Sequence, residues 1–157
     1  MSADAGAGDA PDHDNAEQEV VAVDENDRKQ GVVNRLEAHT GDGVRHRAFI
    51  ALVFDLDGRI LLAQRSPEKR LWDTCWDGTV ASHPDPGEDQ EAAAATRLEE
   101  ELGVVPNQYE DLRVTDKFEY RRYYMEEGVE YEVCTVLKCR LVDTDLAPDA
   151  DEVGAQR

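Results

Sequence analysis

The chain has 157 residues, with 36 acidic side chains against 17 basic ones and a formal net charge of -19. A surface this negative repels nucleic-acid phosphates, so general nucleic-acid binding is excluded, and an anionic substrate must be held by local Lys/Arg clusters or by metal. The length suits one domain, and no apolar run approaches the roughly 20 residues of a membrane helix.

The N-terminal part of the chain changes character near its start. Residues 1–16 are rich in alanine, glycine and aspartate without apolar periodicity, so burial cannot offset the entropy of ordering them. We predict a disordered acidic tail here and a single domain over residues 17–157. The apolar run at 20–23 predicts a strand, 24–27 a turn, and 31–33 a strand that pairs back.

A hairpin and a long loop follow. Residues 46–54 (HRAFIALVF) and 59–65 (RILLAQR) predict two strands joined by a turn at 55–58. Their nearly continuous apolar character predicts that both faces of this sheet are covered. Residues 66–77 carry a proline, two tryptophans and several charges, which predicts an irregular loop with a functional role.

The strongest helix signal spans residues 89–102 (DQEAAAATRLEEEL). This segment is acidic in its first turn and is followed by Gly103, a residue typical of the position after a helix. Apolar residues recur every four positions along one stripe, and Arg97 and Glu101 lie on the neighbouring stripe. We therefore expect a charged pair beside the buried face.

Two strands close the predicted fold. Residues 113–124 predict one strand, and 129–142 predict a longer one whose alternation places Glu130 and Glu132 on the same face. Residues 143–148 predict a loop, with no further element before the end of the chain. Mixed strands with one long helix place the chain in the α/β (α+β) class.

Histidines and glutamates supply a first candidate site. Three of the four histidines lie in the predicted domain: His39 and His46 flank a glycine-containing loop, and His83 precedes the helix. With Glu130 and Glu132 they could complete a set of imidazole and carboxylate ligands that suits zinc, manganese or iron. Adjacent carboxylates facing a core are costly without a cation. The alternative is three separately hydrogen-bonded histidines and two solvated glutamates.

A second candidate site gathers charged residues around the helix. Glu88 and residues 99–101 are acidic, and Mg²⁺ bound to a diphosphate needs only one or two protein carboxylates. Arg65, Lys69 and Arg97 are scarce cations near this helix that could hold a phosphate. The alternative is an exposed acidic helix face with ordinary surface ion pairs.

Six motifs follow one another between about residues 32 and 153: AHTGDGVRHRAF, RSPEKRLWDTCWDGTV, SHPDPGE, EEELGV, KFEYRR and EYEVC. In this order and spacing they resemble the type I isopentenyl-diphosphate isomerase family of the Nudix superfamily. The segment from Ser82 to Val104 is similar to a degenerate Nudix box, with Ser82 where hydrolases carry glycine and Thr96-Arg97 where they carry Arg-Glu. The resemblance implies a Nudix-type mixed β-sheet sandwiched by helices.

The resemblance also implies two divalent-metal sites and a diphosphate site. The implied ligands of the first ion, which is Mn²⁺, Zn²⁺ or Mg²⁺, are His39, His46, His83, Glu130 and Glu132. Glu101 would hold a Mg²⁺ ion against the substrate diphosphate. The implied phosphate contacts are Arg35, Arg65, Lys69 and Arg97. Glu132 would be one member of the acid/base pair, with Tyr120 beside it and Trp72 or Trp76 walling the pocket.

The chain departs from the family's pattern at two places. Ala81 occupies the position of the family's second acid/base residue, a cysteine, and a methyl group cannot transfer a proton. The chain also ends before the family's last strand and helices. We therefore expect a domain that is incomplete at its C-terminus, with an active site open on one side.

The function implied by the resemblance is isomerisation of isopentenyl diphosphate to dimethylallyl diphosphate in isoprenoid biosynthesis. The reaction protonates one face of an alkene and removes a proton from the other. The alternatives are a Nudix-type diphosphate hydrolase and a non-catalytic diphosphate-binding homologue. The absence of a signal-peptide pattern and three cysteines without CxxC spacing predict a cytoplasmic protein. We also expect a monomer with no membrane partner, and the acid excess is typical of high-salt organisms.

Overall fold

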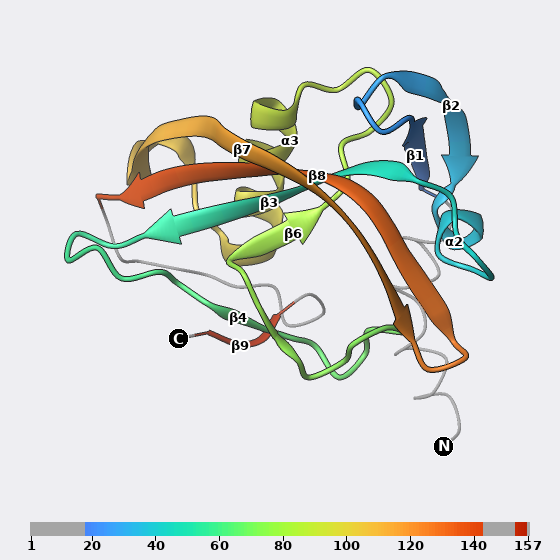
Figure 1. The fold of residues 1–157 in the computed structure, drawn as a ribbon. Helices are drawn as coiled ribbons and strands as arrows, with labels where there is room; N and C mark the ends of the chain where they lie inside the picture. The colour runs from blue at the N-terminus through green and yellow to red at the C-terminus, as the bar shows by residue number, and fades with distance from the viewer. Residues whose placement is uncertain (1–17, 143–152, 157) are drawn as a thin grey trace.

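Two β-sheets form the framework of the fold (Figure 1). The computed structural model describes residues 18–142 and 153–156. The larger sheet has the order β2-β1-β3-β8-β7 with β6 beside β3, and the smaller has the order β5-β4-β9. The elements are β1 (Glu19–Val23), β2 (Lys29–Asn34), α2 (Arg35–Ala38), β3 (His46–Phe54), β4 (Ala63–Arg65), β5 (Trp76–Asp77), β6 (Val80–Ser82), α3 (Gln90–Leu102), the 3-10 helix η1 (Pro106–Gln108), β7 (Tyr109–Tyr124), β8 (Gly128–Leu141) and β9 (Val153–Gln156).

The parallel pair of β3 and β8 lies inside the larger sheet. Their register runs from His46 beside Glu132 to Phe54 beside Arg140. Residues of β3 alternate between two faces: Phe49 and every second residue after it are buried in the main core with residues of α3. His46 and every second residue after it therefore belong to the opposite face. In Figure 1, α3 lies above the sheet, and β4 and β9 lie below it.

Helix α3 has the ends that the sequence predicts. The Asp89 carboxylate accepts a hydrogen bond from the amide of Ala92 at 3.2 Å, which caps the first turn. Gly103 ends the helix in the left-handed conformation, with φ 66°, which glycine adopts without strain. Leu98 and Leu102 are fully buried in the main core. The helix therefore closes one face of the sheet.

The loop before β5 is packed onto the β7–β8 hairpin. Leu71 is buried, and a Cβ atom added at Gly128 would lie 2.8 Å from its side chain. The rings of Trp72 and Tyr124 approach to 5.0 Å between centroids. These contacts hold the tryptophan-containing loop over the end of the hairpin, where it forms one wall of a cavity.

The mixed sheet with few helices is confirmed, but two predictions near the small sheet are wrong. The strand predicted over residues 59–65 is reduced to β4, and Ile60 makes only an isolated bridge with Phe54. The physical reason is that β3 already has β6 and β8 as neighbours, so both of its edges are occupied. The second error concerns β9, a strand that the sequence pattern does not predict and that pairs with β4.

The tail predicted over residues 1–16 and the loop predicted over 143–148 lie outside the described residues. Within the described part of the chain, no helix is both long and apolar enough to cross a bilayer.

Candidate metal and catalytic site

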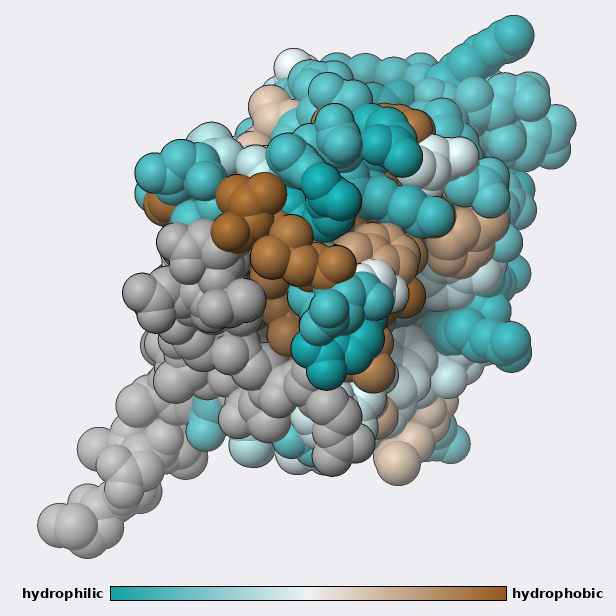
Figure 2. All heavy atoms as spheres, turned by 90° about the vertical axis from the view of Figure 1, so that its left-hand side faces the viewer, coloured by the Kyte–Doolittle hydropathy of each residue, from teal (hydrophilic) through white to brown (hydrophobic). Residues whose placement is uncertain are grey.

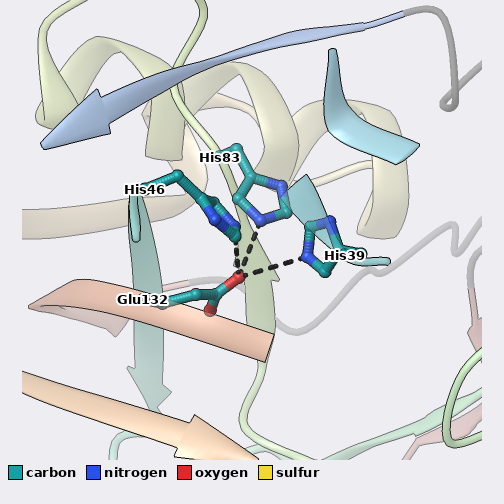
Figure 3. Close-up of side chains that lie close together, drawn as sticks. All are labelled: His39, His46, His83 and Glu132. Atoms are coloured by element: carbon teal, nitrogen blue, oxygen red, sulfur yellow. Dashed lines mark hydrogen bonds and ion pairs between the residues drawn. The ribbon is translucent and has the colours of Figure 1, made fainter. Parts of the chain in front are cut away.

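Four buried side chains from four parts of the chain converge on one point (Figure 3). His46 begins β3, Glu132 lies on β8, His39 follows α2 and His83 follows β6. One ligand atom from each lies within 4.8 Å of those of the other three. The Oε2 atom of Glu132 lies 2.8 Å from His83 Nε2, 3.0 Å from His46 Nε2 and 3.5 Å from His39 Nε2.

The backbone fixes the orientation of two of the imidazole rings. His39 Nδ1 lies 2.7 Å from the carbonyl oxygen of Arg35, and His46 Nδ1 lies 2.7 Å from that of Val44. A carbonyl oxygen can only accept, so each Nδ1 atom carries a hydrogen and donates it. In a neutral ring, the lone pair of Nε2 then points toward Glu132. This arrangement of a second partner behind the ligand is typical of metal-binding histidines.

Electrostatics favour the same arrangement. Burial lowers the pKa of His83 to about 3 and also lowers that of His39, which keeps both rings neutral. Burial alone would raise the pKa of Glu132, but hydrogen bonds with the three imidazoles outweigh it and hold that pKa well below its usual range, which requires a hydrogen on Nε2 while no cation is bound. When a cation takes the place of that hydrogen, neutral nitrogen lone pairs and an anionic carboxylate face it at a buried point. A divalent cation is the group that this donor set fits.

Tyr120 joins this cluster to a second carboxylate. Its phenol oxygen lies 2.7 Å from Glu132 Oε1 and 2.8 Å from Glu130 Oε2. One phenol has one hydrogen, so it can donate to only one of these oxygens, and the other short contact needs a proton on a carboxyl group. Burial and the neighbouring Glu132 raise the pKa of Glu130 to about 7, which makes Glu130 the protonated partner.

The buried cluster makes the metal-free protein sensitive to acid. The folded-state pKa values of His83 and His39 lie below 6.5. Below pH 6.5 the unfolded chain therefore binds more protons than the folded one, and the free energy of unfolding decreases as the pH is lowered. Glu130 opposes this between pH 7 and 4.5, since its pKa of about 7 lets the folded state bind its proton first.

Two histidines against one glutamate leave a net loss of stability on acidification between about pH 6.5 and 4.5. Below that range the loss steepens, because Glu130 is protonated in both states and Glu132, with its lowered pKa, contributes in the same direction as the histidines. Urea unfolding with a chelator, repeated across this pH range, measures the slope. A stability that is constant or rises on acidification would contradict it.

A cavity of about 340 Å³ opens beside Glu130. Trp72 and Trp76 line it, as the resemblance implies, together with Arg65 and Arg122. Arg122 was missed by the sequence analysis, although it follows Tyr120 by two positions on the same strand and so shares its face. The cavity thus combines aromatic walls, two cations, the carboxylate of Asp77 and the carboxyl group of Glu130, which Tyr120 links to the histidine–glutamate cluster.

The predicted phosphate contacts lie in three parts of the structure. Arg65 lies in β4 and Lys69 in the loop after it. Arg35 begins α2, and its carbonyl oxygen accepts the hydrogen bond from His39 Nδ1. Arg97 lies on α3 and donates to Ser82 Oγ at 2.9 Å. Glu101 is buried on the same helix and is not one of the four converging side chains.

Ala81 lies on β6, in register with Ile50 of β3. Ile50 follows His46 by four positions, so Ala81 faces the same side of the sheet as His46 and Glu132. Its methyl group is exposed. The position of Ala81 is therefore open toward the face that carries the cluster.

Comparison with known proteins identifies relatives of this chain. The NUDIX domain family matches residues 44–156. The isopentenyl-diphosphate Delta-isomerase of Haloarcula marismortui is 65% identical over 141 residues, which are 90% of this chain and 75% of the relative. That of Halobacterium salinarum is 60% identical over 90% of this chain and 66% of its own length. Isopentenyl-diphosphate Delta-isomerase 1 of Photorhabdus laumondii is 37% identical over 83% of this chain and 72% of its own.

Solved structures show the same fold at low sequence identity. The crystal structure of DR0079 from Deinococcus radiodurans superimposes with a TM-score of 0.70 at 21% identity, covering 89% of this chain and 82% of that one. The MutT protein of Methanosarcina mazei gives a TM-score of 0.56 at 19% identity, over 72% and 75% of the two chains.

Proposed function

We propose a division of roles among these residues on the premise that the chain belongs to the isopentenyl-diphosphate isomerase family of the Nudix superfamily. The chain is an isomerase that interconverts isopentenyl diphosphate and dimethylallyl diphosphate. Its relatives at 37–65% identity are isomerases, so the alternative of a diphosphate hydrolase is not favoured. The observation that carries the residue assignment is the contact of Glu132 with three imidazoles on one oxygen and with Tyr120 on the other.

The two oxygens of Glu132 have different partners, and we assign them different tasks. Oε2 faces the imidazoles of His39, His46 and His83 and would bind the divalent ion with them. Oε1 contacts Tyr120, and we assign it the proton that is exchanged with the substrate alkene. When bound, the ion supplies positive charge that compensates the carboxylate and fixes its orientation.

Glu130 and Tyr120 support this proton-transfer group. With a pKa raised to about 7, Glu130 can hold a proton near neutral pH, and the Tyr120 phenol connects it to Glu132. We assign Glu130 a place next to the ion, as the family resemblance implies, and a hydrogen bond to Tyr120 in its absence. The aromatic walls of the adjacent cavity exclude water from a cationic intermediate and offer π density to it.

We assign the diphosphate to the scarce cations Arg35, Arg65, Lys69 and Arg97, with Mg²⁺ held by Glu101. Arg65 supports this assignment because it lines the cavity beside Glu130. Mg²⁺ shared between one carboxylate and phosphate oxygens is a common arrangement. The identity of the ion among the histidines, Mn²⁺, Zn²⁺ or Mg²⁺, is left to metal analysis of the purified protein.

The direct test is incubation of the purified chain and Mg²⁺ with isopentenyl diphosphate, followed by chromatography of the products. Dimethylallyl diphosphate is the expected product. Release of inorganic phosphate would instead indicate a hydrolase, and binding without turnover would indicate a non-catalytic homologue. A domain over residues 17–157, a monomeric state and a cytoplasmic location are further proposals, the second of which light scattering tests.

Restoring a thiol at position 81 is expected to accelerate isomerisation. Ala81 faces the same side of the sheet as Glu132, and a positioned proton-transfer group typically contributes about 10²–10⁴-fold to a rate. We expect Ala81→Cys to raise kcat at least tenfold, with Ala81→Ser as the matched control of similar size but much weaker acidity. An unchanged rate in Ala81→Cys would show that this position does not lie opposite Glu132 across the substrate.

A further inference from the structure

A second cavity, of about 360 Å³, lies toward the other end of β8. Lys138 of β8 and Arg113 of β7 line it, with Phe54 at the end of β3. Lys138 follows Glu132 by six residues, which is about 20 Å along an extended strand. This cavity is therefore separate from the histidine–glutamate cluster and its adjoining pocket.

The two cations at this cavity lie in an unfavourable pairing. Arg113 and Lys138 are direct cross-strand partners, and like charges in that position destabilise a sheet. The chain has 36 acidic residues for 17 basic ones, so a carboxylate is available for almost any cation. Among the described residues, however, neither side chain forms an ion pair, and Lys138 Nζ instead lies 5.6 Å from the centre of the Phe54 ring.

The acidic side chains nearby leave this charge largely uncompensated. Asp55 lines the cavity, but its carboxylate accepts a bond from Arg59 at 2.7 Å. Arg140 also lines it and is paired with Glu110. Asp111 contributes one carboxylate, at a bulge where the register of β7 shifts and its own φ is 58°. Among the described residues that line the cavity, Arg113 and Lys138 are thus set against the single carboxylate of Asp111.

Apolar side chains form the rest of the cavity wall. Phe54 is half-buried, and Leu56 is 64% exposed. Figure 2 looks onto this end of the molecule, where hydrophobic side chains form a patch among hydrophilic ones. The combination of two adjacent cations with an aromatic and an aliphatic side chain is suited to a small molecule with an anionic head and an apolar body.

We propose that this cavity binds an organic phosphate. A phosphate dianion placed between Arg113 and Lys138 neutralises both cations and removes the repulsion between them, which a single carboxylate does only in part. The apolar body of the ligand then lies against Phe54 and Leu56. This second site shares no lining residue with the pocket beside Glu130, and it does not depend on the roles proposed for the isomerase site.

Phenyl phosphate is a suitable probe, because it joins a phosphate to a ring that can stack on Phe54. Titration of the full chain, followed by ¹H–¹⁵N NMR, is expected to shift the amides of Phe54 and Leu56. The double variant Arg113→Gln/Lys138→Gln should weaken this binding at least tenfold. The control Arg28→Gln/Lys29→Gln removes the same charge from the β1–β2 hairpin and should leave the affinity unchanged.

Three further measurements distinguish binding at this cavity from binding at the isomerase site or to any exposed cation. Arg65→Gln acts on the pocket beside Glu130, so the shifts at Phe54 should persist in that variant; their loss would overturn the proposal. Inorganic phosphate should bind at least tenfold more weakly than phenyl phosphate, and equal affinity would show that no apolar group is recognised. Lys138→Gln alone should raise the melting temperature of the free protein, and a lower value would indicate a structural role for this cation.

Discussion

Replacing Glu132 by glutamine is expected to lower kcat for isomerisation by about 10²–10⁴-fold, because an amide keeps the size of the carboxyl group but can neither hold nor release the proton. The variant also removes the negative charge that faces three buried imidazoles, so metal content should fall with activity. Both quantities are measured on the same sample, by product formation and by elemental analysis. Circular dichroism confirms that the sheet is retained.

The matched control for this variant is Glu119→Gln on the neighbouring strand β7. Glu119 is a partly exposed partner of Arg45 at 2.8 Å, and exposed ion pairs contribute at most about 1 kcal/mol. Its substitution should leave both kcat and metal content within a factor of two of the parent. If Glu132→Gln retained full activity, the proton-transfer role of this residue would be refuted.

Replacing His83 by alanine is expected to abolish tight binding of the divalent ion. His83 Nε2 makes the shortest of the three imidazole contacts to Glu132, at 2.8 Å, and its side chain is buried. Loss of even a residue that merely orients a ligand costs about 10–100-fold in metal affinity, so loss of a ligand should cost at least that much. Elemental analysis after dialysis against metal-free buffer measures the change, and full retention would refute the assignment.

His13→Ala provides the control for that experiment. The chain has four histidines, and His13 lies outside the described residues, whereas the other three form the cluster. Removing it tests whether any loss of a histidine lowers metal content. The control should keep the metal content of the parent, and it should keep its activity as well.

Local signals were sufficient to predict some elements correctly. Helix α3 was predictable because its cap residues Asp89 and Gly103 and its apolar stripe are all contained within one short segment. Strand β3 was predictable from its nearly continuous apolar run, and β8 from the alternation of its residues. Glu130 and Glu132 share a face for the same reason, since residues two positions apart on a strand point the same way.

Tertiary contacts account for what the sequence pattern could not predict. The sequence pattern alone was also compatible with separately hydrogen-bonded histidines and solvated glutamates. Only the register of β3 against β8 brings His46 to Glu132. The bond from Tyr120 to both glutamates likewise depends on the pairing of β7 with β8. The short length of β4 and the presence of β9 depend on which sheet edges are free for pairing. A local sequence pattern does not show which edges are free.

The parallel pairing of β3 with β8 also has a consequence for folding, because it joins segments that are far apart in the chain. His46 and Glu132 are separated by 86 positions in the chain, so the ion cannot find its ligands together until this long loop has closed. Long-range parallel pairing is intrinsically slow, so we expect it to limit the rate at which the ion is taken up. An ion that binds only the folded chain then increases the free energy of unfolding. The rate of metal uptake after dilution from denaturant therefore measures how fast the sheet is completed.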